Sequence, residues 1–504
     1  MVRQFELDGP HPPPLEMFAF LIPLTLQCLL LHPTFPSPLS RFLRFALLPL
    51  SLTLSFSAPY RFAIEPRNQA VGVNFVFGIM GGYGVWKALE WGLASDLTPY
   101  TWVGFEENEE EGQTGGGNGP TNGHAANGAA NGHDSTPAKP SKAEVVRRKK
   151  REHAHLLALR AHQAASSTPL SILRDTLHLL LAMRGQGYSF CQTSTEPFPL
   201  PPRAFFRRLS LEIAWSHPLL VFCAALLLEP PTIRDALVYS FLPVPEAWRT
   251  PTVAHNVGEG VTGLAMGIAV FAALTLGYSV ATMLVFLPTV VVRALPIPAG
   301  VKPPPFDPRE YPPLFNFARR PQSVAVFWSK QWHSFFARPF RFLAFDPAHK
   351  LITPLFGKLV SRSVGVLAVF ALSSWIHEYG LSTGTSTLHL SPSPPDPSSL
   401  PLPIRWGGSL YFMLQGVAII LEGAFTALTG RKTGGWGGTV WNAVVSVGVG
   451  GVLYKSWMTQ GLVREVPPVA SWSWPRFVVP LGCLQPPPMW MSSLPESYGF
   501  ERHV

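Results

Sequence analysis

Residues 327–333 read FWSKQWH, and residues 359–378 read LVSRSVGVLAVFALSSWIHE. The first stretch places His333 beside two tryptophans, and a basic, aromatic segment follows it. The second is an apolar run of membrane-helix length that ends in His377 and Glu378. A polar side chain is costly in either setting unless something uses it. The two stretches therefore make these histidines candidates for a functional role in a membrane protein.

The composition of the whole chain favours the same class. Of its 504 residues, 47% are hydrophobic and 14% are charged, whereas soluble domains carry about 25% charged residues. The mean hydropathy is +0.19. We therefore expect an all-α, polytopic membrane protein that resides in a lipid bilayer. The net charge of +9 mostly flanks apolar runs, which indicates positive-inside topology and argues against nucleic-acid binding.

The cysteines argue against two kinds of structural site. Cys28, Cys191, Cys223 and Cys483 are far apart, and no two of them form a CxxC motif. This spacing excludes a disulfide framework and a structural zinc site, and no other metal-ligand spacing is present. We expect no metal.

Apolar segments predict roughly eight or nine membrane spans, by the criterion of about 20 residues per span. The segments are Met17–Leu31, Phe45–Ala58, Val71–Trp86, Ile213–Leu228, Val261–Val292, Leu359–Ser374, Leu410–Ala427 and Trp436–Trp457. The fifth exceeds one span, so it is either a long tilted helix or a broken pair. The third ends in residues 86–91 (WKALEW), an arrangement of aromatic and charged residues typical of the membrane interface.

Composition divides the chain into three parts. Residues 1–104 form N-terminal transmembrane helices, and residues 153–504 form the membrane core. Residues 105–152 contain an acidic cluster, a Gly/Asn/Ala tract and a basic run, Arg147–Arg151. Too few apolar residues are present there for folding, so we expect a disordered loop on the cytosolic side. The basic run either binds anionic lipid or acts only as a topology signal.

Several polar residues near or within the apolar segments are functional candidates. Trp328 and Trp332 are four residues apart and share a face if the segment is helical. Arg338 and Arg341 follow them, and they either grip a phosphate-bearing ligand or anchor the helix among lipid headgroups. An amphipathic helix at residues 171–183, ended by glycines, would present a further arginine at the membrane surface.

His377 is the strongest candidate for a general base, because imidazole titrates near neutral pH. Glu378 or another polar partner would orient it, and the alternative is a structural histidine bonded to a carbonyl. Glu422 lies inside an apolar segment and is either functional or a structural bond to a neighbouring helix.

These motifs together resemble the wax synthase branch of the membrane-bound O-acyltransferase (MBOAT) family. That branch shows an FW…WH segment followed by an apolar helix that ends in S-x-x-HE. Three further stretches are similar to family elements: residues 184–188 (RGQGY) to RGxGW, residues 311–315 (YPPLF) to WPPLF, and residues 412–422 (FMLQGVAIILE) to a late span with an embedded Glu. The chain departs from the pattern at Gln186, Tyr188 and Tyr311, and in its acidic, Gly/Asn-rich loop.

The resemblance implies acyl transfer from acyl-CoA to a hydroxyl group, in the endoplasmic reticulum membrane and with no bound cofactor. His377 would be the base that removes the alcohol proton, and His333 would polarise the acyl group. The CoA phosphates would use arginines, and four other residues would support the site. These arginines are Arg184, Arg338 and Arg341, and the supporting residues are Trp328, Trp332, Glu378 and Glu422.

Two classes of alcohol acceptor stay open. One is a fatty alcohol or other lipid, which gives a wax or neutral ester. The other is a hydroxylated, terpenoid-type secondary metabolite that is acetylated from acetyl-CoA, as fungal members of this branch commonly do. The long insert and proline-rich loops favour a eukaryotic, fungal source.

Two other functions are compatible with the same residues. A transporter or channel would use His377 and Glu422 as a proton or ion relay. A non-catalytic membrane scaffold would need neither histidine except for folding.

Overall fold

The computed structural model describes residues 15–62, 71–105, 142–191, 200–228, 251–298, 302–317, 320–384, 400–460 and 462. The regular secondary structure of these residues is helical throughout. Extended backbone pairs within them only at an isolated bridge between Trp102 and Tyr188. The predicted all-α architecture is confirmed.

The N-terminal part packs around α3. Its elements are η1 (Leu15–Phe18), α1 (Leu21–Leu29), α2 (Ser37–Arg61), α3 (Val71–Leu93), η3 (Thr98–Tyr100), α4 (Lys142–Ser166) and α5 (Pro169–Leu181). Helices α1, α2 and α3 contact one another and bury a common core with α5, to which Leu24, Trp91 and Leu179 contribute. Helix α3 of this core also contacts α11 (Asp346–Gly384), the helix that carries His377.

Helix α4 corrects the prediction for residues 105–152. The helix begins at Lys142, so the basic run Arg147–Arg151 is helical and exposed. Its residues are mostly Lys, Arg, Glu, Ala and Leu, which are strong helix formers even where nothing packs on them. Residues 106–141 of the predicted loop lie outside the described part of the chain.

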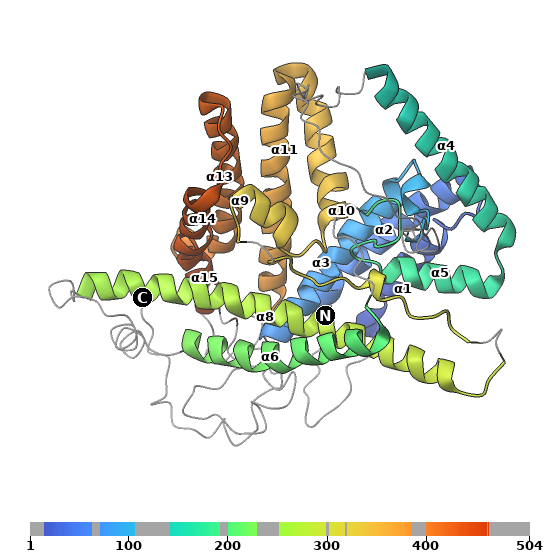
Figure 1. Cartoon of the computed structure of the whole chain (residues 1–504), viewed down its shortest axis with the longest axis horizontal. Helices are drawn as coiled ribbons and strands as arrows, with labels where there is room; N and C mark the ends of the chain where they lie inside the picture. Colours follow the sequence, from blue (N-terminus) through green and yellow to red (C-terminus); the bar gives the residue numbers. More distant parts are fainter. Residues whose placement is uncertain are drawn as a thin grey trace, which may run out of the picture.

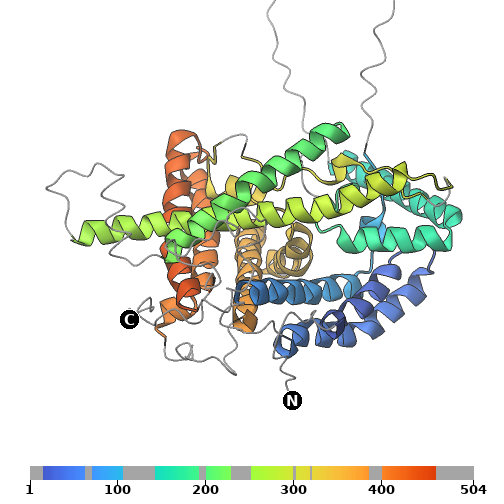
Figure 2. The same cartoon turned by 90° about the horizontal axis from the view of Figure 1, so that it is seen from below.

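Two long helices run across the molecule. They are α6 (Pro202–Leu228) and α8 (Pro251–Ala294), which pack side by side and cross below α11 and α13 in the view of Figure 1. The predicted choice between one long helix and a broken pair is decided in favour of one helix, because α8 is continuous over 44 residues. Figure 2 shows the same pair from below.

The central stretch is a series of short helices that leads into a helical hairpin. The series is η7 (Pro308–Glu310), α9 (Val324–Val326), the π-helix η8 (Phe327–Gln331), α10 (Ala337–Pro339), the π-helix η9 (Phe340–Phe345) and α11 (Asp346–Gly384). Within α11, Gly357 has φ of +77° and reverses the chain. Figure 1 shows the two arms side by side.

Contacts between the two arms agree with this reversal. The hydroxyls of Thr353 and Ser361 are 2.9 Å apart across the turn. A Cβ on Gly365 would lie 2.8 Å from the Phe345 ring, so this glycine lets the arms approach closely. The predicted span Leu359–Ser374 is therefore the second arm of a hairpin. It continues to Gly384, which places His377 inside the helix and not at its end.

The C-terminal helices pack on the second arm. They are α12 (Leu402–Arg405), α13 (Gly407–Thr429), α14 (Gly435–Ala443), the π-helix η11 (Val444–Gly448) and α15 (Gly450–Thr459). Helix α13 lies along α11 and contacts α15, and α15 contacts α8. A second core joins α6, α8, α11, α13 and α15 through residues such as Leu276, Phe370 and Phe412.

Five helical segments of the described chain are long and apolar enough to cross a membrane. They are Ser37–Arg61, Gly260–Ala294, Ala337–Gly384, Gly407–Thr429 and Gly435–Thr459. The first predicted segment forms a shorter apolar helix over Leu15–Leu29. Helices α3 and α6 occupy predicted positions but are not among the five. The chain is thus an all-α, polytopic membrane protein.

Candidate active site

His377 lies on the second arm of α11 with one ring nitrogen fixed. Its Nδ1 is 2.7 Å from the carbonyl oxygen of Ser373, one turn earlier. Because a carbonyl only accepts, Nδ1 carries the proton and Nε2 keeps the lone pair. The ring lies 4.4 Å from the Phe412 ring and nearly parallel to Trp457 at 5.9 Å between centroids. The backbone and two aromatic rings thus hold a basic nitrogen in a defined orientation.

Glu378 does not orient His377. Its Oε1 accepts hydrogen bonds from the Ser409 backbone N–H at 2.8 Å and from the Ser409 hydroxyl at 3.1 Å. Ser409 is in the first turn of α13, where backbone N–H groups have no partner within the helix. Glu378 therefore joins α11 to the start of α13, and the partner of His377 is the Ser373 carbonyl, which is also the arrangement expected of a structural histidine.

His333 lies in the non-helical segment that follows η8. Its ring is surrounded by aromatic rings, among them Trp332 at 5.6 Å and Phe335 at 5.4 Å between centroids. Its Nδ1 is buried and has no hydrogen-bond partner among the described residues. Burial, followed by the charges of His377 and Arg184, lowers its pKa to about 3. His333 is therefore neutral at pH 7 and can offer one N–H to a ligand.

Aromatic contacts connect the two histidines. Trp332 stands next to His333 and contacts Trp328, whose ring is 5.7 Å away. Trp328 in turn contacts Phe412 at 6.2 Å, and Phe412 lies against His377. The hairpin explains this meeting, since the reversal at Gly357 falls roughly midway between the histidines and returns the chain to the same end.

Gln415 is a site residue that the sequence reasoning missed. It is fully buried on α13, where its Oε1 accepts a hydrogen bond from Trp328 Nε1 at 3.1 Å. Its Nε2 donates to the Val445 carbonyl at 3.1 Å. It lies three residues after Phe412, hence on the same helix face. A glutamine within an apolar segment was the available signal.

Glu422 is an anchor for the segment that leads to His333. Its two carboxylate oxygens accept hydrogen bonds from the backbone N–H groups of Val324 at 2.7 Å and Ala325 at 3.1 Å. A carboxylate at the start of a helix is favourable, because the N–H groups there are unpaired and the dipole is positive. Of the two alternatives, the geometry favours the structural bond. Glu422 is ten residues beyond Phe412, roughly 15 Å along α13, which is too far for a direct relay with His377.

Arg184 is buried and holds together two segments of the site. Its Nε donates to the Ser334 hydroxyl at 2.9 Å, next to His333. Its Nη1 donates to the carbonyls of Pro312 at 2.8 Å and Pro313 at 3.2 Å. Only 8% of the residue is exposed. The expected presentation at the membrane surface is therefore wrong, and Arg184 positions the segment that carries His333.

The other two arginines differ from each other. Arg338 donates from Nε to Glu90 Oε1 at 3.1 Å, and Glu90 is fully buried. Lys87 and Tyr100 also bond to Glu90, at 3.1 and 2.9 Å. Arg341 is about half exposed and lies 3.5 Å from Asp346. Of the three predicted arginines, Arg341 is the one accessible to a charged ligand.

The buried charges of α3 correct the prediction of an interfacial segment at residues 86–91. Lys87 and Glu90 are 4% and 0% exposed, and they form an ion pair inside the protein. The sequence signal for this buried ion pair was a Lys and a Glu three residues apart in an apolar segment. Such a pair can be buried when the opposite charges compensate each other.

No group of three or more His, Cys, Asp or Glu side chains within the described residues could hold a metal ion. Cys28, Cys191 and Cys223 are free thiols, and Cys483 lies outside the described residues.

Comparison with known proteins finds a similarity in the central stretch. Residues 311–391 match the model of the membrane bound O-acyl transferase family. Neither the curated proteins nor the solved structures provide a match. The matched residues include both histidines, the hairpin and the segment that Arg184 holds. Over this stretch the chain is similar to the membrane bound O-acyl transferase family.

Proposed function

We propose that this protein transfers an acyl group from acyl-CoA to the hydroxyl of an apolar alcohol. The observation that carries the proposal is the hydrogen bond between His377 Nδ1 and the Ser373 carbonyl. It leaves Nε2 as a fixed acceptor for the alcohol proton, which is the property a general base requires. The family match at residues 311–391 supports acyl transfer as the reaction class.

In the proposed reaction, His377 Nε2 takes the proton as the alcohol oxygen attacks the thioester carbonyl. The carbonyl oxygen becomes negatively charged, and the neutral His333 donates a hydrogen bond to it. The tetrahedral intermediate then collapses and expels the CoA sulfur, which recovers the proton from His377. The products are an ester and free CoA, and His377 returns to its starting state.

The substrates reach this centre from different environments. An apolar alcohol dissolves in the bilayer, and His377 lies in a segment capable of crossing it. The phosphates of CoA stay in water, and Arg341, just before α11, is an exposed cation that can meet them. Both acceptor classes, a fatty or other lipid alcohol and a terpenoid-type metabolite, stay within the proposal, as does residence in the endoplasmic reticulum.

The test is an acyl-transfer assay on membranes that contain this chain. Labelled acetyl-CoA and long-chain acyl-CoA are offered separately, each with fatty alcohols, sterols and terpenoid alcohols. Loss of a general base is expected to slow turnover by about 10²- to 10⁴-fold in His377→Ala. His333→Ala is expected to lose about 10²- to 10³-fold, the effect of removing one oxyanion donor.

His349→Ala is the matched control, because this histidine lies on the first arm of the same hairpin and stacks on Phe345. It is expected to keep wild-type activity. Normal turnover in His377→Ala would disprove the base assignment. Ion or solute transport that needs no CoA and survives loss of His333 would favour the transporter instead.

A further inference from the structure

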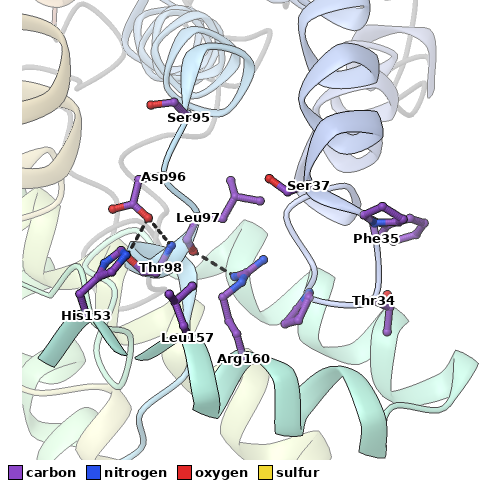
Figure 3. A pocket seen from close by; sticks show the side chains of 12 residues that line it. Thr34, Phe35, Ser37, Ser95, Asp96, Leu97, Thr98, His153, Leu157 and Arg160 are labelled. Atoms are coloured by element: carbon purple, nitrogen blue, oxygen red, sulfur yellow. Dashed lines mark hydrogen bonds between the residues drawn. The ribbon is translucent and has the colours of Figure 1, made fainter. Parts of the chain in front are cut away.

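A cavity of about 440 Å³ is lined by residues of the N-terminal part of the chain, far in sequence from His333 and His377. Three segments enclose it: the turn between α1 and α2, the segment after α3, and one face of α4 (Figure 3). Its lining residues are Pro33, Thr34, Phe35, Pro36, Ser37, Ser95, Asp96, Leu97, Thr98, His153, Leu157 and Arg160. None of them takes part in the proposed acyl transfer.

The surrounding elements place this cavity at the depth of lipid headgroups. Helix α2 is a candidate membrane span, and its first residue, Ser37, lines the cavity. Helix α4 carries the exposed cations Arg147–Arg151, which cannot enter the hydrocarbon layer. A cavity between the end of a membrane span and a cationic helix lies in the interfacial region of the bilayer, where lipid phosphates border the hydrocarbon core.

The α4 wall of the cavity contains the guanidinium of Arg160. His153, Leu157 and Arg160 recur at helical spacing on one face, and Lys149 precedes His153 by one turn on that face. Arg160 is 9% exposed and is fixed by bonds from its two Nη atoms to the carbonyls of Leu97 and Leu31. Burial lowers its pKa to about 10, so it is still charged at pH 7. Such a wall suits a phosphate group.

The opposite wall contains a carboxylate. Asp96 uses Oδ1 to accept hydrogen bonds from the Thr98 backbone N–H at 2.9 Å and hydroxyl at 2.8 Å. Its Oδ2 makes no hydrogen bond with the described residues. Figure 3 shows the two bonds of Asp96 to Thr98 and the bond from Arg160 to the Leu97 carbonyl. Asp96 is near enough to Arg160 for its charge to raise the pKa of the guanidinium. An anionic ligand alone would be repelled by Asp96, and a cation alone by Arg160.

A ligand that carries both a negative and a positive charge can pair with Arg160 and with Asp96 at the same time. We propose that this cavity binds the headgroup of phosphatidylethanolamine, with the phosphate at Lys149, His153 and Arg160 and the ammonium at Asp96. The primary ammonium donates hydrogen bonds to a carboxylate, which a choline group cannot do. The apolar lining of Pro33, Phe35 and Leu157 suits the start of the lipid's hydrocarbon part.

The test uses the purified full-length protein in detergent and measures retained lipid by native mass spectrometry. The probes are phosphatidylethanolamine, phosphatidylcholine and phosphatidylglycerol with identical acyl chains, together with soluble phosphoethanolamine. Since a charge-assisted hydrogen bond is strong, we expect about tenfold preferential retention of phosphatidylethanolamine over phosphatidylcholine. Asp96→Asn should abolish this preference, and His153→Ala combined with Lys149→Gln should weaken retention of all phospholipids.

Asp96→Asn keeps an Oδ1 acceptor for Thr98, so the local turn is preserved. Asp307→Asn, which changes a carboxylate paired with Arg309 outside the cavity, is the matched control and should retain the preference. Equal retention of all three phospholipids by the wild type, or an unchanged preference in Asp96→Asn, would overturn the proposal. Competition by soluble phosphoethanolamine at the lipid's own concentration would also overturn it, in favour of a water-soluble ligand.

Discussion

The surroundings of His333 determine its charge and, through it, a pH dependence of stability. Burial first, and then His377 and Arg184, lower its pKa from 6.5 to about 3. Because the folded pKa lies below the unfolded value, the unfolded chain binds the proton first as pH falls. The stability contribution present above about pH 6.5 is therefore lost between about pH 6.5 and pH 3.

This expectation can be measured by thermal unfolding of the purified protein at about pH 7.5 and about pH 5. The wild type should lose more Tm between the two conditions than His333→Gln, whose side chain does not titrate. His153→Gln is a control for the substitution itself, since this histidine is exposed. Equal losses in wild type and His333→Gln would show that the folded pKa of His333 is close to the unfolded one.

At the scale of elements, the turn at residues 184–188 depends on two glycines. Gly185 and Gly187 have φ of +65° and +78°. A Cβ on Gly187 would also lie 2.3 Å from the Trp102 ring, which pairs with this turn through the bridge to Tyr188. The glycines thus allow the chain that follows α5 to pack closely and to deliver Arg184 to the segment of His333.

Gly187→Ala is expected to destabilise the protein and to lower its activity. The left-handed conformation alone costs about 1 kcal/mol for a residue with a Cβ, and the clash with Trp102 adds to it. Gly104→Ala is the matched control, because Gly104 has φ of +71° but its Cβ would meet nothing closer than 3.9 Å. Chemical denaturation of both variants separates the cost of the left-handed backbone from the cost of the clash with Trp102. Equal destabilisation of the two variants would mean that Trp102 moves aside freely.

At the scale of the whole molecule, one buried ion pair joins the N-terminal core to the hairpin. Glu90 of α3 binds Arg338 at the start of the hairpin, and Lys87 and Tyr100 complete its hydrogen bonds. Removing one charge from a buried pair leaves the other uncompensated. The attachment of the hairpin to the N-terminal helices therefore depends on this carboxylate.

Glu90→Gln is expected to lower the free energy of unfolding by about 3–5 kcal/mol. The matched control uses Arg341, which lies three residues after Arg338. Arg341 forms an exposed ion pair with Asp346. Asp346→Asn is expected to change stability by less than about 1 kcal/mol. Chemical denaturation of the two variants makes the comparison, and similar losses would contradict a special role for the buried pair.

The architecture was predictable from the sequence because apolar runs and their flanking charges report directly on membrane helices. The spans at Leu359–Ser374 and Leu410–Ala427 appear within α11 and α13. The reversal at Gly357 was not predicted, because a single glycine in a helical pattern is usually tolerated within the helix. Its positive φ follows from the packing of the two arms on each other.

The candidate site residues were chosen by residue type and surroundings, but their hydrogen-bond partners were not predictable. The histidines were identified from their surroundings, and the assignment of their catalytic roles stays a prediction. The partner of Glu378 is 31 residues away and that of Arg338 is 248 residues away, and such distant pairs leave no periodic pattern. Arg184 was expected at the surface because it follows an amphipathic helix that is ended by glycines, whereas carbonyls of the proline-rich segment hold it inside.

The hairpin at Gly357 has a consequence for how this protein can diversify. It brings His333 and His377 to one end within a continuous piece of chain, so the two histidines are inherited as a unit. The helices that pack on this hairpin, such as α3 and α13, come from other parts of the chain. Changes in those helices can alter the surroundings of the histidines while the hairpin itself is left untouched. Under the proposed acyl transfer, a lineage carrying this hairpin can acquire new products through mutations that never reach the histidines.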